Sequence, residues 1–292
     1  MEVTAYAKLN LTLEVLGPRD DGFHQVRSVL QTIGLADRLT IETAATLRVA
    51  CDDPSLDGEA NLVWNAARAL ANRGGITAGA RISIAKGIPV SMGLGGGSSD
   101  AAAALIGLNQ LWGLALGIED LRQVASELGS DVAFFLNGGT ALAEGRGEVI
   151  SPLPALPNMP VLLACPNISI QSKTATMYSR LTLAHYSDGG ITSRLIQILM
   201  GGQFVLESVA GLTYNIFEEV AYQVFPQLEQ IWRLLDSIST NPVRLAGAGP
   251  ALFCLPATEA EFQEAANALQ PLGVGVYLVN TVVDIPGALS RA

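Results

Sequence analysis

A run of small residues is the feature of this sequence best suited to chemistry. It reads Gly93-Leu94-Gly95-Gly96-Gly97-Ser98-Ser99. Because most of these residues have little or no side chain, the main chain can approach an anion closely and turn its N–H groups toward it. An alanine-rich helix is predicted to follow, with Ser98, Ser99 and Asp100 as its N-cap residues and its positive end directed at the run. The run predicts a phosphate-binding loop; the alternative is a flexible loop before a capped helix.

Two well-known phosphate-binding loops do not fit this run. The P-loop of nucleotide hydrolases ends in Gly-Lys-Ser/Thr, which does not occur here. The dinucleotide-binding fingerprint requires its first glycine directly after a strand, whereas Pro89 intervenes here. Ser98 also occupies the place of the third glycine of that fingerprint. The run therefore belongs to neither motif.

Polar and aromatic residues outside the loop are further candidates. Lys8 and Asn10 are two residues apart on an alternating segment, so they face the same side, about 6.7 Å apart at roughly 3.3 Å per residue. Taken alone, Lys8 is typical of a solvated lysine on an edge strand, Asp131 of a helix N-cap, and Phe23-His24 of a surface turn. Neither of the two histidines has partners at metal-ligand spacing, so zinc is not supported.

The elements that must position these residues are mixed without strict alternation, which predicts an α+β fold. Residues 4–15 alternate between apolar and polar positions and predict a half-buried strand with Lys8 on its polar face. A proline-rich stretch at 151–160 separates two predicted domains, 1–152 and 153–292. The other predicted elements are strands at 26–33, 39–43, 47–51, 81–85, 161–164 and 274–282, a strand and loop at 243–255, and helices at 61–73, 99–111, 118–128, 174–183, 193–200, 216–237 and 259–269.

The net charge of −10 argues against a nucleic acid or an anionic membrane as partner, because either would need a basic face. It also implies that a bound polyphosphate would be held by main-chain N–H groups and a helix N-terminus rather than by a cluster of cations. No run approaches the roughly 18 apolar residues of a membrane helix. The N-terminus lacks the pattern of a secretory signal, and the three cysteines lack metal-type spacing, so we expect a cytoplasmic protein.

Four stretches carry a resemblance to a known family. They are Pro89-Val90-Ser91-Met92-Gly93-Leu94-Gly95-Gly96-Gly97-Ser98-Ser99-Asp100-Ala101-Ala102, Ala7-Lys8-Leu9-Asn10-Leu11, Asp21-Gly22-Phe23-His24 and Gly129-Ser130-Asp131-Val132-Ala133-Phe134-Phe135. Together they closely resemble the GHMP kinases, the family of galactokinase, homoserine kinase and mevalonate kinase. The resemblance is strongest to the branch in the non-mevalonate isoprenoid pathway that phosphorylates a cytidine diphosphate-linked methylerythritol. It implies an N-terminal domain like the second domain of ribosomal protein S5, a ferredoxin-like C-terminal domain, and substrates in the cleft between them.

The resemblance also implies roles for individual residues. Lys8 and Asp131 would flank the hydroxyl that is phosphorylated, with Asp131 as the base and ATP and Mg²⁺ as the cofactors; the ligands of the metal are not implied. A lysine beside an aspartate favours the ionised carboxylate, which suits a loose phosphoryl-transfer transition state. The expected substrate-binding residues are Asn10, Phe23, His24, Thr174, Tyr178, Gly247 and Gly249, with the aromatic rings and His24 selecting cytosine. The expected ATP-binding residues are Asn61, Lys86, Pro89, Val90, Ser91, Met92, Gly93, Leu94, Gly95, Gly96, Gly97, Ser98 and Ser99.

Some positions depart from the family pattern. Phe23 stands where tyrosine is usual, so stacking would survive while a hydroxyl contact would be lost. Ala246 and Ala248 stand where serines are usual, which leaves main-chain donors alone in that loop. A kinase for another alcohol, such as homoserine or mevalonate, is an alternative that gives no reason for the Phe23-His24 pair. A third hypothesis is a nucleotide-binding regulatory protein without turnover. The presence of both Lys8 and Asp131 disfavours it. The oligomeric state stays open.

Overall fold

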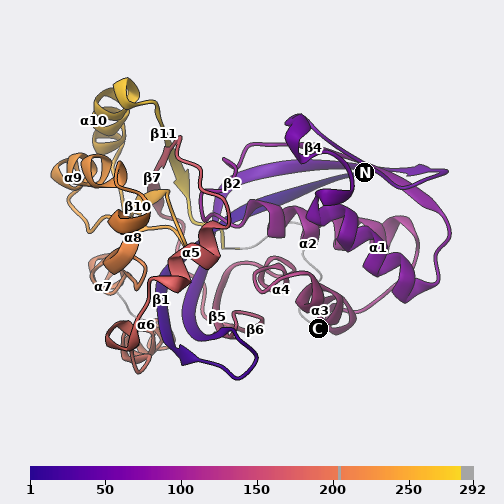
Figure 1. Cartoon of the computed structure of the whole chain (residues 1–292), viewed down its shortest axis with the longest axis horizontal. Helices are drawn as coiled ribbons and strands as arrows, with labels where there is room; N and C mark the ends of the chain where they lie inside the picture. The colour runs from indigo at the N-terminus through magenta and orange to yellow at the C-terminus, as the bar shows by residue number, and fades with distance from the viewer. Residues whose placement is uncertain (203–204, 284–292) are drawn as a thin grey trace.

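The structure is a computed structural model that describes residues 1–202 and 205–283, and within these residues the strands form a seven-stranded and a four-stranded sheet (Figure 1). Helices pack against both sheets, and the strands pair mostly antiparallel. The fold class is therefore α+β, as the sequence predicts. Among the same residues, every helix is too short or too polar to cross a bilayer.

The large sheet is built around one long hairpin. Its strands pair in the order β3-β4-β2-β1-β8, and β5 pairs with β2 and β6. The second hairpin strand was expected as two strands, 26–33 and 39–43, and this expectation is wrong. The strand continues through Gly34 because a register shift beside Ala7 lets its pairing with β1 resume. The strands are β1 Glu2–Pro18, β2 His24–Ala44, β3 Arg48–Cys51, β4 Gly79–Ala85, β5 Thr140–Gly145, β6 Val149–Pro152 and β8 Tyr214–Asn215.

The polar face of β1 is not solvated, which corrects the expectation of a half-buried strand. Lys8, Asn10, Thr12 and Glu14 are each at most 5% exposed. Elements from the C-terminal half cover this face: the Glu14 carboxylate accepts hydrogen bonds from Ser187 Oγ at 2.9 Å and from the Thr192 N–H at 2.7 Å, at the start of the helix Gly190–Met200. The polar row is thus an internal feature between the two halves of the chain.

Helices of the N-terminal half cover one face of the large sheet (Figure 1). The helix after the glycine run begins at Gly96, three residues earlier than expected, with Gly95 at φ +77° as its N-cap. The expected N-cap residues, Ser98 to Asp100, lie inside the first turns, because glycines adopt both the capping and the helical conformation without steric cost. The helices are α1 Leu62–Gly74, α2 Gly96–Leu111, α3 Ile118–Leu128 and α4 Val132–Phe135, with short 3₁₀ turns at Pro54–Leu56 and Gly58–Ala60.

The C-terminal half forms the small sheet, in the order β11-β7-β10-β9, and its covering helices. The single helix expected at 216–237 is instead two helices, separated at Phe225-Pro226, because proline lacks the N–H of the helical ladder. The elements are β7 Pro160–Pro166, β9 Arg244–Leu245, β10 Leu252–Cys254, β11 Val274–Asn280, α5 Lys173–Ser179, α6 Gly190–Met200, α7 Leu206–Gly211, α8 Glu218–Val224, α9 Leu228–Ile238, α10 Glu259–Leu269, and 3₁₀ turns at Leu183–His185 and Gln270–Leu272.

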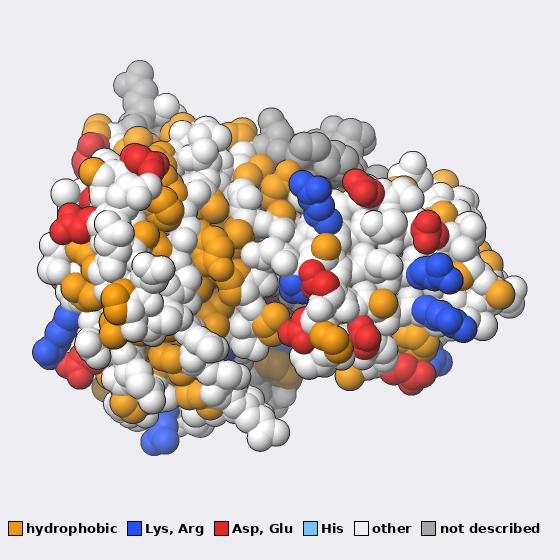
Figure 2. Space-filling model, turned by 90° about the horizontal axis from the view of Figure 1, so that it is seen from above, with side chains coloured by type: hydrophobic (Ala, Val, Ile, Leu, Met, Phe, Trp, Pro, Cys, Tyr) orange, Lys and Arg blue, Asp and Glu red, His pale blue; other side chains and the backbone are white. Residues whose placement is uncertain are grey.

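The two halves share a hydrophobic core. One buried cluster contains Leu9 and Ile33 of the hairpin together with Leu163 of β7 and Phe253 of β10. Strand β8 pairs in parallel with β1, and Thr281 bridges to Ile33. On the face that Figure 2 shows, Lys and Arg side chains lie as separate spots among Asp and Glu. Although the net charge of the chain is −10, this face carries both positive and negative side chains.

Candidate functional site

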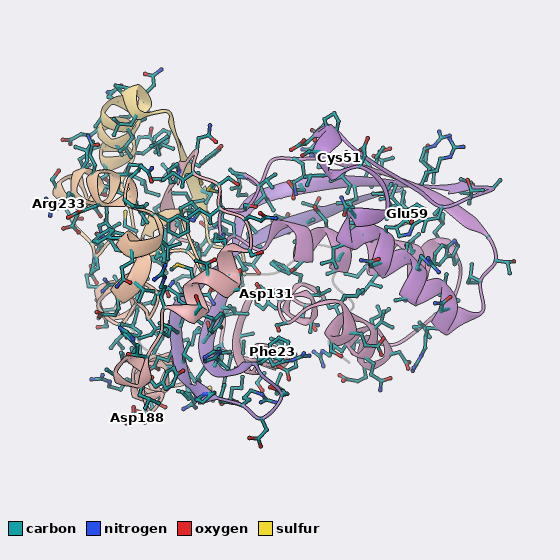
Figure 3. The ribbon with its side chains drawn as sticks, viewed as in Figure 1. Phe23, Cys51, Glu59, Asp131, Asp188 and Arg233 are labelled. Carbon is teal, nitrogen blue, oxygen red and sulfur yellow. The ribbon has the colours of Figure 1, made fainter. Side chains whose placement is uncertain are left out.

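Two neighbouring cavities lie along the glycine run. The larger, of about 850 Å³, is lined from both halves of the chain, and the smaller, of about 410 Å³, is lined from the N-terminal half. Gly93, Gly95 and Ser98 line both. In Figure 3, Asp131 and Phe23 lie in the middle of the molecule, with Arg233 far to one side and Glu59 to the other. The glycine run is thus the boundary between two spaces that could hold two different ligands.

The start of α2 presents unpaired main-chain donors to the smaller cavity. The first hydrogen bond of the helix runs from the Ser99 N–H to the Gly95 carbonyl at 2.9 Å. Helix geometry leaves the N–H groups of Gly96, Gly97 and Ser98 without intrahelical acceptors, and all three residues line this cavity. Such a helix start attracts anions.

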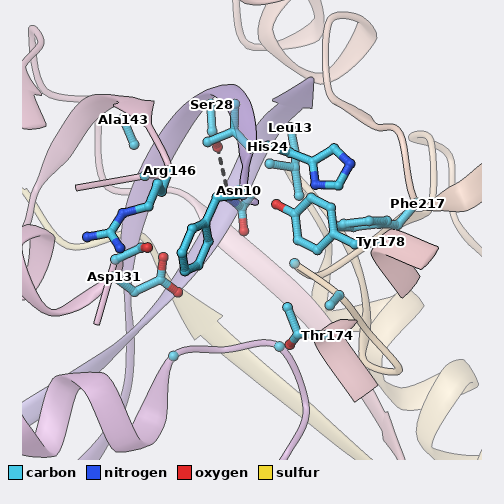
Figure 4. Close-up of a pocket in the computed structure, with 18 of the residues that line it drawn as sticks. Asn10, Leu13, His24, Ser28, Asp131, Ala143, Arg146, Thr174, Tyr178 and Phe217 are labelled. Atoms are coloured by element: carbon cyan, nitrogen blue, oxygen red, sulfur yellow. Dashed lines mark hydrogen bonds between the residues drawn. The ribbon is translucent and has the colours of Figure 1, made fainter. Parts of the chain in front are cut away.

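A lysine and an aspartate face each other in the larger cavity. Lys8 Nζ lies 3.4 Å from Asp131 Oδ2 and donates a hydrogen bond of 2.7 Å to Asn10 Oδ1. The amide of Asn10 in turn donates to Ser28 Oγ at 2.7 Å, as the dashed line in Figure 4 shows. These partners compensate the burial of the Lys8 charge. The Lys8 N–H also donates to the Leu94 carbonyl at 2.9 Å, which ties β1 to the glycine run.

Aromatic residues form the other end of the larger cavity. The rings of His24 and Tyr178 are stacked with their centroids 4.8 Å apart, and Phe217 meets Tyr178 edge-on at 4.9 Å. Burial, with the Asp131 charge, raises the pKa of Tyr178 to about 12. Figure 4 shows Tyr178 and His24 on one side of the space and Arg146 on the other. A flat aromatic ligand that stacks on Tyr178 uses the face opposite His24 or displaces the imidazole.

Phe23 and Arg146 lie close together at this end of the cavity. Phe23 is 50% exposed, and the Arg146 guanidinium lies 4.8 Å from the centroid of its ring. Arg146 was not predicted from the sequence, because a single arginine between two glycines resembles an ordinary turn. Its position in the lining adds a positive charge beside the aromatic residues.

A buried cluster of charges forms part of the smaller cavity. Lys86 Nζ donates to Asp37 Oδ2 at 2.5 Å and to Asp100 Oδ2 at 2.9 Å. Asp37 Oδ1 also accepts hydrogen bonds from the N–H groups of Gly87 and Ile88. Asp100 Oδ1 is buried without a hydrogen-bond partner, and burial together with the Asp37 charge raises the pKa of Asp100 to about 7. The Lys86 ammonium therefore points toward buried carboxylates rather than into the cavity.

A second glycine loop, residues 246–249, packs against the first. A Cβ atom at Gly247 would lie 2.7 Å from the Gly93 carbonyl oxygen and 3.4 Å from Lys8 Nζ, so this approach requires glycine. Ala246 is fully buried. The carbonyl of Gly249 accepts a hydrogen bond from Lys173 Nζ, which also donates to the Ser91 carbonyl at 2.7 Å. Lys173 was not among the predicted site residues.

Most of the residues expected from the sequence line one of the two cavities. Ser99 and Gly249 line neither; the Ser99 hydroxyl is buried and donates to the Tyr6 carbonyl at 2.7 Å. Within residues 1–202 and 205–283, no group of three or more His, Cys, Asp or Glu side chains could hold a metal ion. The larger cavity contains Lys8, Asn10, Phe23, His24, Asp131, Thr174, Tyr178 and Gly247, and the smaller contains Asn61, Lys86 and every residue from Pro89 to Ser98.

Comparisons with known proteins find one family over most of the chain. Residues 61–139 match the model of the GHMP kinases N terminal domain, and residues 205–273 match that of the GHMP kinases C terminal domain. A Dehalococcoides mccartyi protein named 4-diphosphocytidyl-2-C-methyl-D-erythritol kinase is 39% identical over 284 residues, 97% of this chain and 98% of that protein. A crystal structure of 4-(cytidine 5'-diphospho)-2C-methyl-D-erythritol kinase matches with a TM-score of 0.79 and 31% identity over 96% of this chain and 99% of that one.

A more distant match separates fold from function. The crystal structure of homoserine kinase from Cytophaga hutchinsonii matches with a TM-score of 0.74 at 17% identity, over 98% of this chain and 96% of that one. At this identity the match concerns the fold alone.

Proposed function

The chain belongs to the GHMP kinase family, in the branch of the 4-diphosphocytidyl-2-C-methyl-D-erythritol kinases, and we propose that it transfers the γ-phosphate of ATP to the 2-hydroxyl of 4-diphosphocytidyl-2-C-methyl-D-erythritol. The products are the 2-phosphate and ADP, and the reaction belongs to isoprenoid precursor synthesis. The homoserine kinase match concerns the fold alone, so the alternative acceptor has less support than the cytidine acceptor of the 39% identical relative.

The observation that best supports the proposal is the Lys8–Asp131 pair. The two charged groups are 3.4 Å apart and line the same cavity as the glycine run and the aromatic residues. An acceptor with its base against Tyr178 and its hydroxyl at Asp131 would span this cavity. ATP in the smaller cavity would bring its terminal phosphate to the shared boundary at Gly93, Gly95 and Ser98.

In the proposed reaction the hydroxyl oxygen attacks the γ-phosphorus, and the bond from that phosphorus to the β–γ bridging oxygen breaks. Asp131 accepts the hydroxyl proton, and ADP leaves with the bridging oxygen. Lys8 holds Asp131 in place and balances the charge of the transferring group. Because the transition state of phosphoryl transfer is loose, positioning and electrostatic stabilisation supply most of the acceleration.

The nucleotide is proposed to bind chiefly through main-chain donors. The N–H groups at the start of α2 would bind phosphate oxygens, while Asn61 and the residues near Lys86 would lie against the adenine and ribose. Asn61 already caps α1, where its Oδ1 accepts from the Val63 N–H at 2.9 Å. The Lys86 ammonium is already paired with two carboxylates. Lys86 would therefore contribute to the shape of the cavity wall rather than form a salt bridge with the nucleotide.

Mg²⁺ fits the residues present as an ion bound mainly by the nucleotide. It takes oxygen ligands, keeps several waters and is usually held by one or two protein groups and phosphate oxygens rather than by a cage of protein carboxylates. The Ser98 hydroxyl, which lines both cavities, would hold it together with phosphate oxygens. When bound, the ion neutralises charge on the β- and γ-phosphates.

Cytosine selection is assigned to the aromatic end of the larger cavity. Phe23 and Tyr178 offer ring faces, His24 and Arg146 offer hydrogen-bonding groups, and Thr174 lies one helical turn from Tyr178. Homoserine and mevalonate contain no base that could use these rings. We also infer that the partners are small molecules, that the protein works in the cytoplasm, and that residues 1–152 and 153–292 are its two domains.

The proposal is tested by an Asp131→Asn variant assayed beside wild type. We expect phosphoryl transfer to the cytidine acceptor to fall by about 100-fold or more, as for loss of a general base, while a nonhydrolysable ATP analogue still binds. Asp236→Asn is a matched control, because Asp236 is exposed on α9 and lines neither cavity. Homoserine and mevalonate serve as competing acceptors. Equal activity in wild type and Asp131→Asn, or faster turnover of either competing acceptor, would contradict the proposal.

A further inference from the structure

The lysines of this chain are few, and their positions are informative. The sequence contains three lysines and fourteen arginines. All three lysines line a cavity: Lys8 and Lys173 the larger, and Lys86 the smaller. Lys8 and Lys86 both form salt bridges with aspartates. Lys173 remains to be explained.

Lys173 is held by carbonyl groups rather than carboxylates. Its ammonium donates to the carbonyls of Ser91 and Gly249, which belong to the first and second glycine loops. An ammonium has three donors, so two carbonyls leave one available. Carbonyl dipoles satisfy hydrogen bonds but do not neutralise the charge. Lys173 therefore brings a positive charge from α5 to the place where the two loops meet, and among residues 1–202 and 205–283 no carboxylate forms a salt bridge with it.

The surroundings of Lys173 favour an anion. Burial and the nearby Lys8 ammonium lower the pKa of Lys173 to about 8. The salt bridge of Lys8 with Asp131 supplies one negative charge against these two positive ones. In a protein with a net charge of −10, this excess is local. A phosphate group would remove the repulsion between the two lysines.

We propose that Lys173 binds the γ-phosphoryl group of ATP during transfer, donating to a phosphate oxygen through the N–H that the two carbonyls leave available. This inference rests on the proposed kinase function. The γ-phosphoryl group is favoured over the diphosphate of the acceptor because Lys173 is bonded to Ser91, in the loop that leads to the free N–H groups of α2. Lys173 would then stabilise the charge of the transferring group from the C-terminal half, opposite the helix start.

The small number of lysines allows a direct test by NMR. Protein labelled with ¹³C at lysine Cε gives one side-chain signal for each of the three lysines, and Lys173→Met identifies the signal of Lys173. We expect saturating adenylyl imidodiphosphate to shift this signal and raise the pKa that it reports, and ADP to leave both unchanged. An equal response to ADP, no response to the triphosphate analogue, or a response to the cytidine acceptor alone would overturn the assignment.

Kinetics provide the second readout. In Lys173→Met we expect the affinity for the triphosphate analogue to fall about tenfold and kcat to fall about 10- to 100-fold, with the ADP affinity and the KM of the acceptor unchanged. Arg180→Met is the matched control, since it removes an exposed cation at the end of the same helix. An equal loss of affinity for both nucleotides would mean that Lys173 only ties the loops together, and the inference would fail.

The assignment of Lys173 and the proposed function can fail independently of each other. If wild type binds the analogue with the expected response of Lys173 but does not turn over the cytidine acceptor, the proposed acceptor is wrong and the assignment of Lys173 stands. If wild type turns over the acceptor and Lys173→Met does so equally fast, the assignment of Lys173 is wrong and the proposed function stands.

Discussion

Gly97→Ala is expected to change stability and ATP binding in opposite directions. A Cβ atom at Gly97 would meet nothing within 4 Å, whereas one at Gly96 would lie 3.2 Å from Ile88 Cγ2. There is therefore room for a methyl group at position 97, and it does not disturb the packing of α2. Alanine in place of glycine within a helix stabilises a protein by about 0.5–1 kcal/mol. We expect the free energy of unfolding to rise by this amount.

The same methyl group would occupy space that a phosphate needs, because Gly97 is exposed and lines the smaller cavity. Loss of one hydrogen bond to a charged group costs about 1.5–3 kcal/mol, which corresponds to about 10-fold or more in Kd. Urea unfolding measures the stability, and calorimetric titration with a nonhydrolysable ATP analogue measures the affinity.

Gly211→Ala is the control for this experiment. Gly211 lies at the end of α7, a Cβ there would also meet nothing within 4 Å, and it lines neither cavity. This variant should bind the analogue as wild type does. If Gly97→Ala also binds as wild type does, the phosphates do not lie at the start of α2, and the reasoning about main-chain donors is refuted.

Two further predictions concern acidity and stacking. Because burial raises the pKa of Asp100 from 3.8 to about 7, the folded protein binds a proton at this carboxyl near neutrality that the unfolded chain does not. Asp100 alone should therefore contribute about 1 kcal/mol of added stability as the pH falls from 8 to 6. Urea unfolding at both pH values checks this, and Asp100→Asn should reduce the difference. Phe23→Ala should raise the KM of the cytidine acceptor about 5- to 100-fold through lost stacking, with ATP affinity unchanged; an unchanged KM would remove Phe23 from the base site.

The sequence predicted the elements that carry the site better than it predicted their surroundings. The alternation at residues 4–15 identified β1 and placed Lys8 and Asn10 on one face, since side-chain direction follows the period of the strand. It could not indicate that this face is buried, because the covering residues, such as Thr192 of α6, lie far away in the sequence. Solvent exposure of a strand depends on tertiary packing that a local pattern does not contain.

The predicted helix boundaries were wrong next to glycine and proline residues. The glycine run looked like a loop up to Ser98, yet Gly96 and Gly97 begin α2, because a glycine permits a helix as readily as a turn. The helix predicted at 216–237 ignored Pro226, although proline is a reliable local signal for a break.

The sequence predicted that main-chain donors rather than a cluster of cations hold the phosphates, and the proposed role of Lys173 adds one cation to them. Lys173 belongs to none of the four stretches that resemble the family, and only its neighbour Thr174 was predicted, as a contact for the cytosine base. The sequence did contain one signal for Lys173, the scarcity of lysine. The chain has three lysines and fourteen arginines, so the position of each lysine in the fold is informative. Its partners, Ser91 and Gly249, come from two loops that only the folded chain brings together.

The common wall of the two cavities has a consequence for inhibitor design. Gly93, Gly95 and Ser98 separate the spaces with almost no side-chain bulk. A bisubstrate molecule, with an adenosine head on one side and a cytidine head on the other, would need only a short bridge over this wall. Joining the heads turns the second binding step into an intramolecular one, so two weak fragments gain avidity without any new contact. Such a compound would exploit the pairing of the proposed adenine site with the proposed pyrimidine site rather than either site alone.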